Sequence, residues 1–180
     1  ITGIIVDSRE THQKLKAFAQ NFMSNVTDKI DHYTGERPLF DLYGVEEEIE
    51  KSLSRRVNLK SGGYVIIDQT EALTTMDVNT GGFIGVRNFD DTIFKTNLEA
   101  AQVIARQLRL RNLGGIIIID FIDMENQRNQ REVENRIRDA LRFDRARVQT
   151  GKISRFGLLE LSRQRLRPAL AETSYIPCPR

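Results

Sequence analysis

The chain has 180 residues, of which 39% are apolar and 29% charged, with a formal net charge of +2. This length suits one good-sized domain, or one domain with an appendage, and no apolar run approaches the length that crosses a bilayer. The single cysteine, Cys178, excludes an intramolecular disulfide framework and fits a reducing cytoplasm.

The first fifty residues are predicted to hold two helices joined by an irregular connection. Ile4–Val6 reads as a short strand without a basic leader, so we expect no signal peptide. The chain does not begin with Met, and we expect it to be a fragment. Asp7 is predicted to cap a helix, with Glu10 as its reciprocal partner. Residues 24–44 carry turn signals, and a second helix is predicted from Val45.

Beyond residue 56 the pattern changes to strands. Segments 57–60 and 64–68 flank Ser61-Gly62-Gly63, which predicts a hairpin. The next strand is predicted at 72–79, followed by a loop over 80–93.

The following helix is predicted to start at Thr96, with Glu99 completing a capping box, and to end near Arg111. The strand Ile116–Ile119 is apolar at every position, which is typical of a central strand covered on both faces. Asp120 comes directly after it.

A helix over 128–142 and strands near 146–150 and 156–162 complete the predicted sheet. The order β–β–β–α–β–α–β–β indicates an α/β (α+β layered) domain, in which a mixed sheet is flanked by helices.

Positive charge gathers late in the chain. Residues 128–167 hold twelve Lys/Arg against five Asp/Glu, a balance of +7, and eleven of the twelve are Arg. Arginine matches phosphate oxygens with a planar fork of donors, so the segment favours a nucleic-acid partner. A solvated helix face is the alternative reading. We expect Arg145 and Arg147 to reach a phosphate, then Arg109 and Arg111, although ion pairs with neighbouring acids compete for each.

Two aspartates carry the predicted chemistry. Asp77 lies in a predicted strand where alternation puts Asn79 on the same face, and Asp120 ends the apolar strand. Strands joined through one helix are often adjacent, so both carboxylates are expected to share one Mg²⁺, which polarises a phosphoryl oxygen and activates water. Turn capping or pairing with an Arg is the alternative for each acid. His12 and His32 lie far from both in sequence.

Longer motifs give the chain a family resemblance. The sequence resembles the bacterial RNase E/G endoribonucleases over most of residues 30–178. The residues that carry the resemblance are Ser61-Gly62-Gly63-Tyr64, Thr70-Glu71-Ala72-Leu73, Met76-Asp77-Val78-Asn79, Thr96-Asn97-Leu98-Glu99-Ala100, Ile104 to Arg111, Gly114, Asp123-Met124 and Ile153 to Glu160.

The resemblance implies a DNase I-like catalytic subdomain over residues 53–174, preceded over 1–52 by part of an RNase H-like subdomain. Asp77 and Asp120 would bind Mg²⁺, for which Mn²⁺ would substitute, and Asn79 would assist. The family cuts single-stranded, A/U-rich RNA in rRNA processing and mRNA decay, leaving a 5′-phosphate and a 3′-hydroxyl. It is cytoplasmic and forms homo-oligomers.

The resemblance is incomplete at both ends. The family carries upstream RNA-binding and 5′-end-sensing modules that residues 1–60 do not supply, so weak binding and slow cutting are expected. It also shares one zinc between two chains through a Cys-Pro-x-Cys link, whereas segment 175–180 holds only Cys178. Two thiolates fall short of the four that a structural zinc takes, so we expect no zinc here. A catalytically idle RNA-binding scaffold is the alternative function, and a DNA nuclease is a weaker one.

Overall fold

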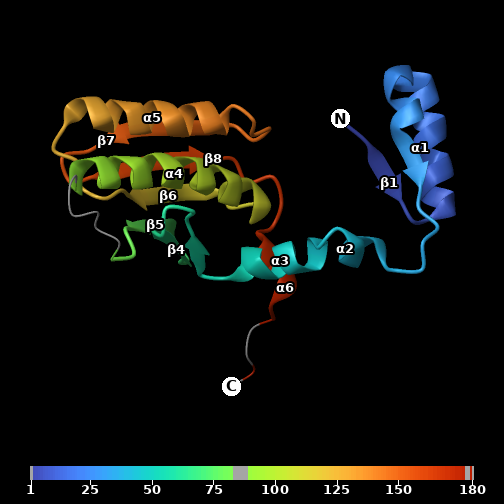
Figure 1. Cartoon of the computed structure of the whole chain (residues 1–180), viewed down its shortest axis with the longest axis horizontal. Coiled ribbons are helices and arrows are strands. Elements are labelled where there is room, and N and C mark those ends of the chain that lie inside the picture. The colour runs from blue at the N-terminus through green and yellow to red at the C-terminus, as the bar shows by residue number, and fades with distance from the viewer. Residues whose placement is uncertain (1, 83–88, 177–178, 180) are drawn as a thin grey trace. The chain divides into compact units, whose positions relative to one another are not determined.

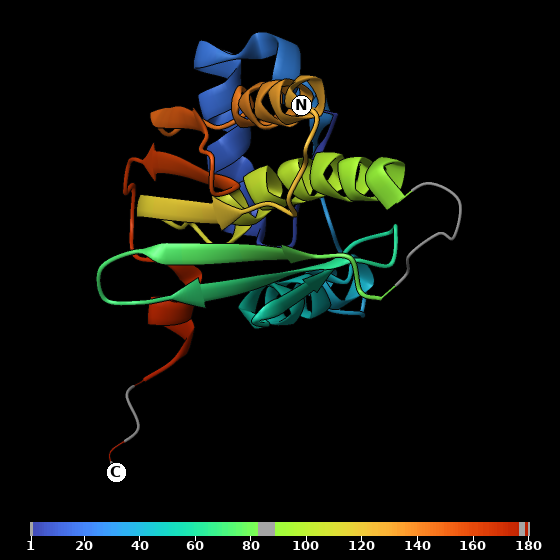
Figure 2. The ribbon, with the colours of Figure 1, turned by 90° about the vertical axis from the view of Figure 1, so that its left-hand side faces the viewer.

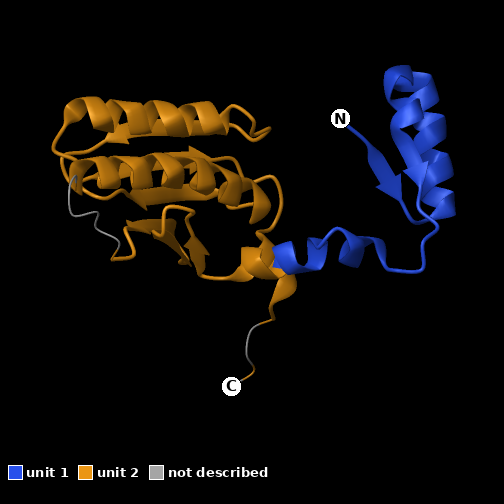
Figure 3. Cartoon of the chain, in the orientation of Figure 1, with its two compact units in different colours: residues 1–49 blue, residues 50–180 orange. Residues whose placement is uncertain are grey.

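The computed structural model describes residues 2–82, 89–176 and 179. The chain forms two compact units, Ile1–Ile49 and Glu50–Arg180 (Figure 3). The division falls within helix α3 (Val45–Leu53). The assignment of residues 1–52, 53–174 and 175–180 to particular subdomains stays a prediction. Of the helices that the structure describes, none is both long and apolar enough to span a bilayer.

The first unit is a small α/β assembly. Strand β1 (Ile4–Val6) pairs in parallel with β2 (Ile30–His32), a strand that the sequence did not predict. The other elements are α1 (Arg9–Phe22), the 3-10 helix η1 (Ser24–Lys29) and α2 (Leu39–Leu42). Its buried core consists of Ala19, Val26 and Ile30.

Helix α1 begins one residue later than the predicted cap implies. Ser8 has extended backbone angles, and its hydroxyl accepts a hydrogen bond from the Thr11 amide at 3.2 Å. The prediction that Asp7 caps this helix was therefore wrong. Both residue types are good caps, and the chain leaves the strand at Val6 in a geometry that gives the role to Ser8.

The second unit is built on a six-stranded mixed sheet with the order β3-β4-β5-β6-β8-β7 (Figure 1). The strands are β3 (Arg56–Asn58), β4 (Tyr64–Gln69), β5 (Thr74–Asn79), β6 (Gly115–Asp120), β7 (Val148–Ile153) and β8 (Leu158–Arg163). Figure 2 shows the antiparallel hairpin of β4 and β5. Within this sheet, β5 and β6 form the one parallel pair among the described residues, and the other neighbouring strands run antiparallel.

Two long helices, α4 (Phe89–Leu110) and α5 (Gln127–Leu141), lie side by side against this sheet (Figure 1), and the short α6 (Leu170–Ser174) ends the described elements. The prediction of an α/β domain with a mixed, helix-flanked sheet is confirmed, as is the order of its elements.

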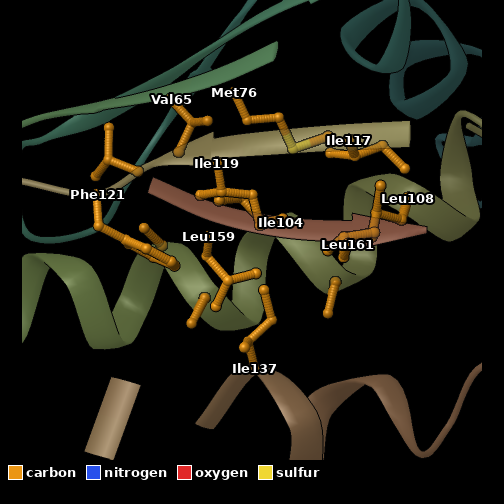
Figure 4. Close-up of a cluster of buried hydrophobic side chains, with 14 of the residues drawn as sticks. Val65, Met76, Ile104, Leu108, Ile117, Ile119, Phe121, Ile137, Leu159 and Leu161 are labelled. Atoms are coloured by element: carbon orange, nitrogen blue, oxygen red, sulfur yellow. The ribbon is translucent and has the colours of Figure 1, made fainter. Parts of the chain in front are cut away.

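The main core lies between one face of the sheet and the two long helices (Figure 4). Alternate residues of the four inner strands point into it, and they meet small and branched side chains of α4 and α5. Its most deeply buried members include Val65, Met76, Ile117, Ile119, Leu159, Leu161, Ile104, Leu108, Val133 and Ile137.

The opposite face of the sheet is open in the part of the chain that the structure describes. In β6, Ile117 and Ile119 are fully buried, whereas Ile116 is 53% exposed. The prediction that this strand is covered on both faces was therefore wrong. A uniformly apolar run conceals the period of two that β6 shares with its neighbours, because an isoleucine on either face looks the same in sequence.

Helix α4 starts seven residues before the predicted cap. Thr96 lies inside the helix, where its hydroxyl donates to the Thr92 carbonyl at 2.9 Å. The Glu99 carboxylate instead accepts the backbone amides of Lys60 and Ser61 at 2.5 and 3.0 Å. The predicted capping box was wrong, and its glutamate fastens the β3–β4 turn to the helix.

Candidate active site

The two predicted site aspartates are direct register partners. In the parallel pair of β5 and β6, Asp77 lies opposite Asp120. Each acid is exposed, while its neighbours Met76 and Ile119 are buried in the core. Since successive side chains of a strand point to opposite faces, both carboxylates project from the open face. Adjacent strands lie about 4.8 Å apart, so the two groups are near neighbours.

Asn79 completes this arrangement from the same strand. It lies two residues after Asp77 and therefore on the same face, and its side-chain amide donates a hydrogen bond to Asp77 Oδ2 at 2.9 Å. This bond restricts the rotation of the carboxylate and leaves its other oxygen available. The structure thus brings together all three residues that the sequence singled out for the chemistry.

Without a bound cation, the carboxylates of Asp77 and Asp120 repel each other when both are ionised. Partial burial raises the pKa of Asp120, and the negative charges of Asp77 and Asp123 raise it further. Carboxylates of like charge at one site oppose each other's ionisation. A cation or a shared proton at this position would relieve the repulsion.

Asp123 is a neighbour of the acid pair that the sequence did not predict as a site residue. It lies in the loop after β6, exposed to solvent, and acts on Asp120 through its charge. An acid three residues beyond a strand-end aspartate was the available signal. Loop geometry, however, decides whether such a residue turns back towards the strand end.

The donor set fits a hard cation that keeps much of its water. Mg²⁺ usually takes one or two protein carboxylates and completes its shell with water and substrate phosphate. Asp77 and Asp120 are exposed enough for that water to enter. Across the described ranges, no group of three or more His, Cys, Asp or Glu side chains has the arrangement of a ready-made metal site. The two carboxylates alone would leave most of the coordination of such an ion to water and substrate.

The structure does not place Arg145 and Arg147 beside the acids. Strand β7 starts at Val148, which pairs with Arg163, and Arg163 pairs with Gly115 at the start of β6. Asp120 is at the other end of β6, about 17 Å away along the strand. Both arginines are exposed, so they remain available to a polyanion, but at the far edge of the sheet.

Arg109 and Arg111 also lie at that far end. Arg109 is exposed and donates to the Ala140 carbonyl at 3.4 Å, which ties α4 to α5. Arg111 is only 7% exposed, its Nε donates to Gln107 Oε1 at 2.8 Å, and burial lowers its pKa. Arg111 is thus enclosed by the fold. The zinc-link residue Cys178 lies outside the described residues.

A turn next to the acid pair was also missed as a site element. Leu158, the first residue of β8, is the register partner of Asp120, and residues 154–157 form the turn before it. A cavity of about 250 Å³ adjoins this turn and is lined by Asp123, Met124 and Arg155 among others. The run Arg155-Phe156-Gly157 between two strands was the sequence signal.

Comparisons with known proteins identify the family of this chain. The model of the Ribonuclease E/G family matches residues 1–166. The chain is 54% identical over 176 residues to Ribonuclease G of Escherichia coli (strain K12), an alignment covering 98% of this chain and 36% of that protein. It is 52% identical over 180 residues to Ribonuclease E of Haemophilus influenzae, covering all of this chain and 19% of that protein.

A third relative is Ribonuclease E of Escherichia coli (strain K12), 58% identical over 154 residues, which cover 86% of this chain and 14% of that protein. The chain therefore spans about a third of the Ribonuclease G relatives and less than a fifth of these two Ribonuclease E relatives. Because the family model matches residues 1–166 of the 180, the chain belongs to the Ribonuclease E/G family.

Proposed function

We propose that this chain is the metal-binding catalytic part of an endoribonuclease that hydrolyses single-stranded, A/U-rich RNA. The observation that carries the proposal is the register pairing of Asp77 with Asp120 on the open face of the sheet. The relatives' names, Ribonuclease G and Ribonuclease E, support RNA as the substrate.

In this proposal Asp77 and Asp120 hold Mg²⁺, or Mn²⁺ in its place, through carboxylate oxygens. When bound, such an ion polarises a phosphoryl oxygen and lowers the pKa of an attacking water. Asn79 keeps the Asp77 carboxylate oriented through its 2.9 Å hydrogen bond. The open face leaves room for an RNA strand to lie across the two acids.

The proposed hydrolysis is a direct attack of water on phosphorus and needs no covalent enzyme intermediate. The water oxygen bonds to phosphorus, the bond from phosphorus to the 3′ oxygen breaks, and a proton from the water ends on that oxygen. The products are a 5′-phosphate and a 3′-hydroxyl. His12 and His32 belong to the first unit, where their rings lie 5.3 Å apart, so neither histidine is assigned a role.

The proposed cellular role is RNA processing and mRNA decay in the cytoplasm, and the presence of a single cysteine is compatible with that compartment. Homo-oligomerisation follows only from the family resemblance and stays a prediction for this chain.

The test is cleavage of an end-labelled A/U-rich oligoribonucleotide in Mg²⁺ and in EDTA. Asp77→Asn and Asp120→Asn are expected to abolish cleavage while circular dichroism shows an intact fold. Asp139→Asn, which changes an exposed acid of α5 that pairs with Arg142 at 3.3 Å, is the matched control and should cut normally. RNA binding without metal-dependent products would instead favour the scaffold function, and unchanged cleavage by either active-site variant would remove the metal role.

A further inference from the structure

An exposed aromatic ring stands in the turn that leads to Asp120's strand partner. Phe156 is 68% exposed, in a chain whose largest core residues are fully buried. The turn itself is well ordered by hydrogen bonds. The Gly157 amide donates to the Ser154 carbonyl at 3.0 Å, and the Phe156 amide donates to Ser154 Oγ at 3.2 Å. A rigid turn that holds a large apolar side chain in water calls for a binding partner.

The turn is packed directly against the loop that follows the acid pair. Gly157 has a φ of +79°, and a Cβ at this position would approach Asp123 Oδ1 to 2.9 Å. Glycine is thus needed both for the backbone angle and for the close approach. Leu158 pairs with Asp120. Strand spacings then put the Cα atoms of Phe156 and Asp120 within about 10 Å of each other.

Arg155 gives the ring its electrostatic character. Its guanidinium carbon lies 4.7 Å from the centroid of the Phe156 ring. A cation on one face of an aromatic ring leaves the other face free for a second planar group. The same guanidinium supplies positive charge where an RNA phosphate would pass. The neighbouring cavity of about 250 Å³ offers space for the adjoining nucleotide.

We propose that Phe156 is a stacking platform for one unpaired nucleobase of the RNA strand that lies across Asp77 and Asp120, with Arg155 supporting the ring and facing a phosphate. This inference rests on the proposed function and names how the substrate is positioned there. Stacking is tolerant of base identity, because every base has a π-face, and it requires that the base be unpaired. The platform would therefore select single-stranded over double-stranded RNA.

The chain contains no tryptophan, so Phe156→Trp creates a single fluorescent reporter at the platform. We expect an A/U-rich decamer, titrated in EDTA so that nothing is cut, to quench this fluorescence to saturation. The matched control is Phe22→Trp, because Phe22 is 73% exposed, much like Phe156, and ends α1 in the first unit, which carries none of the residues assigned to the site. Its fluorescence should change by less than a tenth as much. Equal quenching of both reporters, or none at position 156, would overturn the proposal.

A second experiment distinguishes base stacking on Phe156 from nonspecific apolar contact with the RNA. Phe156→Ala is expected to weaken decamer binding about tenfold, Phe156→Leu nearly as much, and Phe156→Tyr to restore it. Decamers carrying one abasic site at successive positions should lose affinity at one position for the parent chain and at none for Phe156→Ala. If Phe156→Leu bound the decamer as tightly as the parent chain while Phe156→Ala did not, the proposal would be wrong, because leucine is apolar but cannot stack on a base.

Both experiments are read in EDTA, so they do not depend on cleavage. Quenching at position 156 in a chain that shows no metal-dependent cleavage would refute the proposed function and keep the platform as part of an RNA-binding surface. Metal-dependent cleavage without quenching would refute the platform alone.

Discussion

Arg163 and Asp144 form an ion pair that is almost completely withdrawn from solvent, with side chains 3% and 1% exposed. Arg163 Nε donates to Asp144 Oδ2 at 2.8 Å and Nη2 donates to Oδ1 at 3.1 Å, while Nη1 donates to the Leu113 carbonyl at 2.9 Å. The pair joins the loop after α5 to the end of β8 and to the start of β6. The ion pair thereby stabilises the end of the sheet that is farthest along β6 from the acid pair.

Breaking this pair should destabilise the second unit severely. Arg163→Ala leaves a buried carboxylate without its partner, which costs about 3–5 kcal/mol of unfolding free energy. Urea denaturation followed by circular dichroism measures this. The matched control is Arg142→Ala, since Arg142 and Asp139 are 80% and 62% exposed and such surface pairs contribute about 0–1 kcal/mol. Similar losses in both variants would contradict a structural role for the buried pair.

The same pair predicts how stability responds to acid. Burial raises the pKa of Asp144, but hydrogen bonds from Arg163 and from the Ala146 amide outweigh it and leave that pKa below its ordinary value of 3.8. The folded state therefore holds the proton less tightly than the unfolded chain does. The resulting stability is fully present above the unfolded pKa and is lost as pH falls below about 4 through the folded pKa. A pH series of thermal unfolding should show a steeper loss in this range for the parent chain than for Asp144→Asn.

Asp120→Asn is predicted to stabilise the metal-free protein while it removes the response to metal. Because the folded pKa of Asp120 is raised by partial burial and then by Asp77 and Asp123, the folded state loses stability as pH rises from 3.8 through that raised value. Asparagine carries no charge and escapes this loss. Melting temperatures in EDTA at pH 7 should thus be higher for the variant, and added Mg²⁺ should raise only the parent's. Equal stabilisation of both by Mg²⁺ would place the ion elsewhere.

Asn79→Ala should affect chemistry without affecting the fold. The variant loses the hydrogen bond that orients Asp77, and loss of such an outer partner typically lowers metal affinity or activity about 10- to 100-fold. Cleavage rates across a Mg²⁺ titration test this, with Asn135→Ala on exposed α5 surface as the control. Full activity at low Mg²⁺ would show that Asp77 needs no support from Asn79.

The sequence predicted those features that depend on period and adjacency. Alternation put Asp77 and Asn79 on one face, and the connection of the two strands through one helix predicted that Asp120 lies beside them, as the structure confirms. The sequence-based predictions were wrong where several neighbouring residues are equally suited to begin a helix. Asp7 and Ser8 are both good helix caps, and only the path of the chain after β1 selects Ser8. Thr96 and Glu99 matched a capping box, yet the helix extends back to Phe89.

Other features were beyond reach because they depend on contacts distant in sequence. The three-residue strand β2 forms because β1 lies beside it, and nothing in Ile30–His32 alone distinguishes it from a loop. Arg145 and Arg147, and then Arg109 and Arg111, were the predicted RNA contacts. The register of β6, β8 and β7 instead puts the first two near the end of the sheet away from Asp120, and α4 ends beside the other two, ahead of β6. The exposure of Phe156 likewise follows from how its turn packs on the loop of Asp123.

The pairing of β5 with β6 also determines which changes of length the molecule tolerates. Residues added to the surface turns leave the two acids opposite each other. One residue inserted within β5, ahead of Asp77, would instead rotate that carboxylate into the hydrophobic interior and push a core methionine or valine into water. Such an insertion would disrupt the hydrophobic core and the acid pair together, so a variant of altered length that still folds is expected to keep residues 77 and 120 opposite each other.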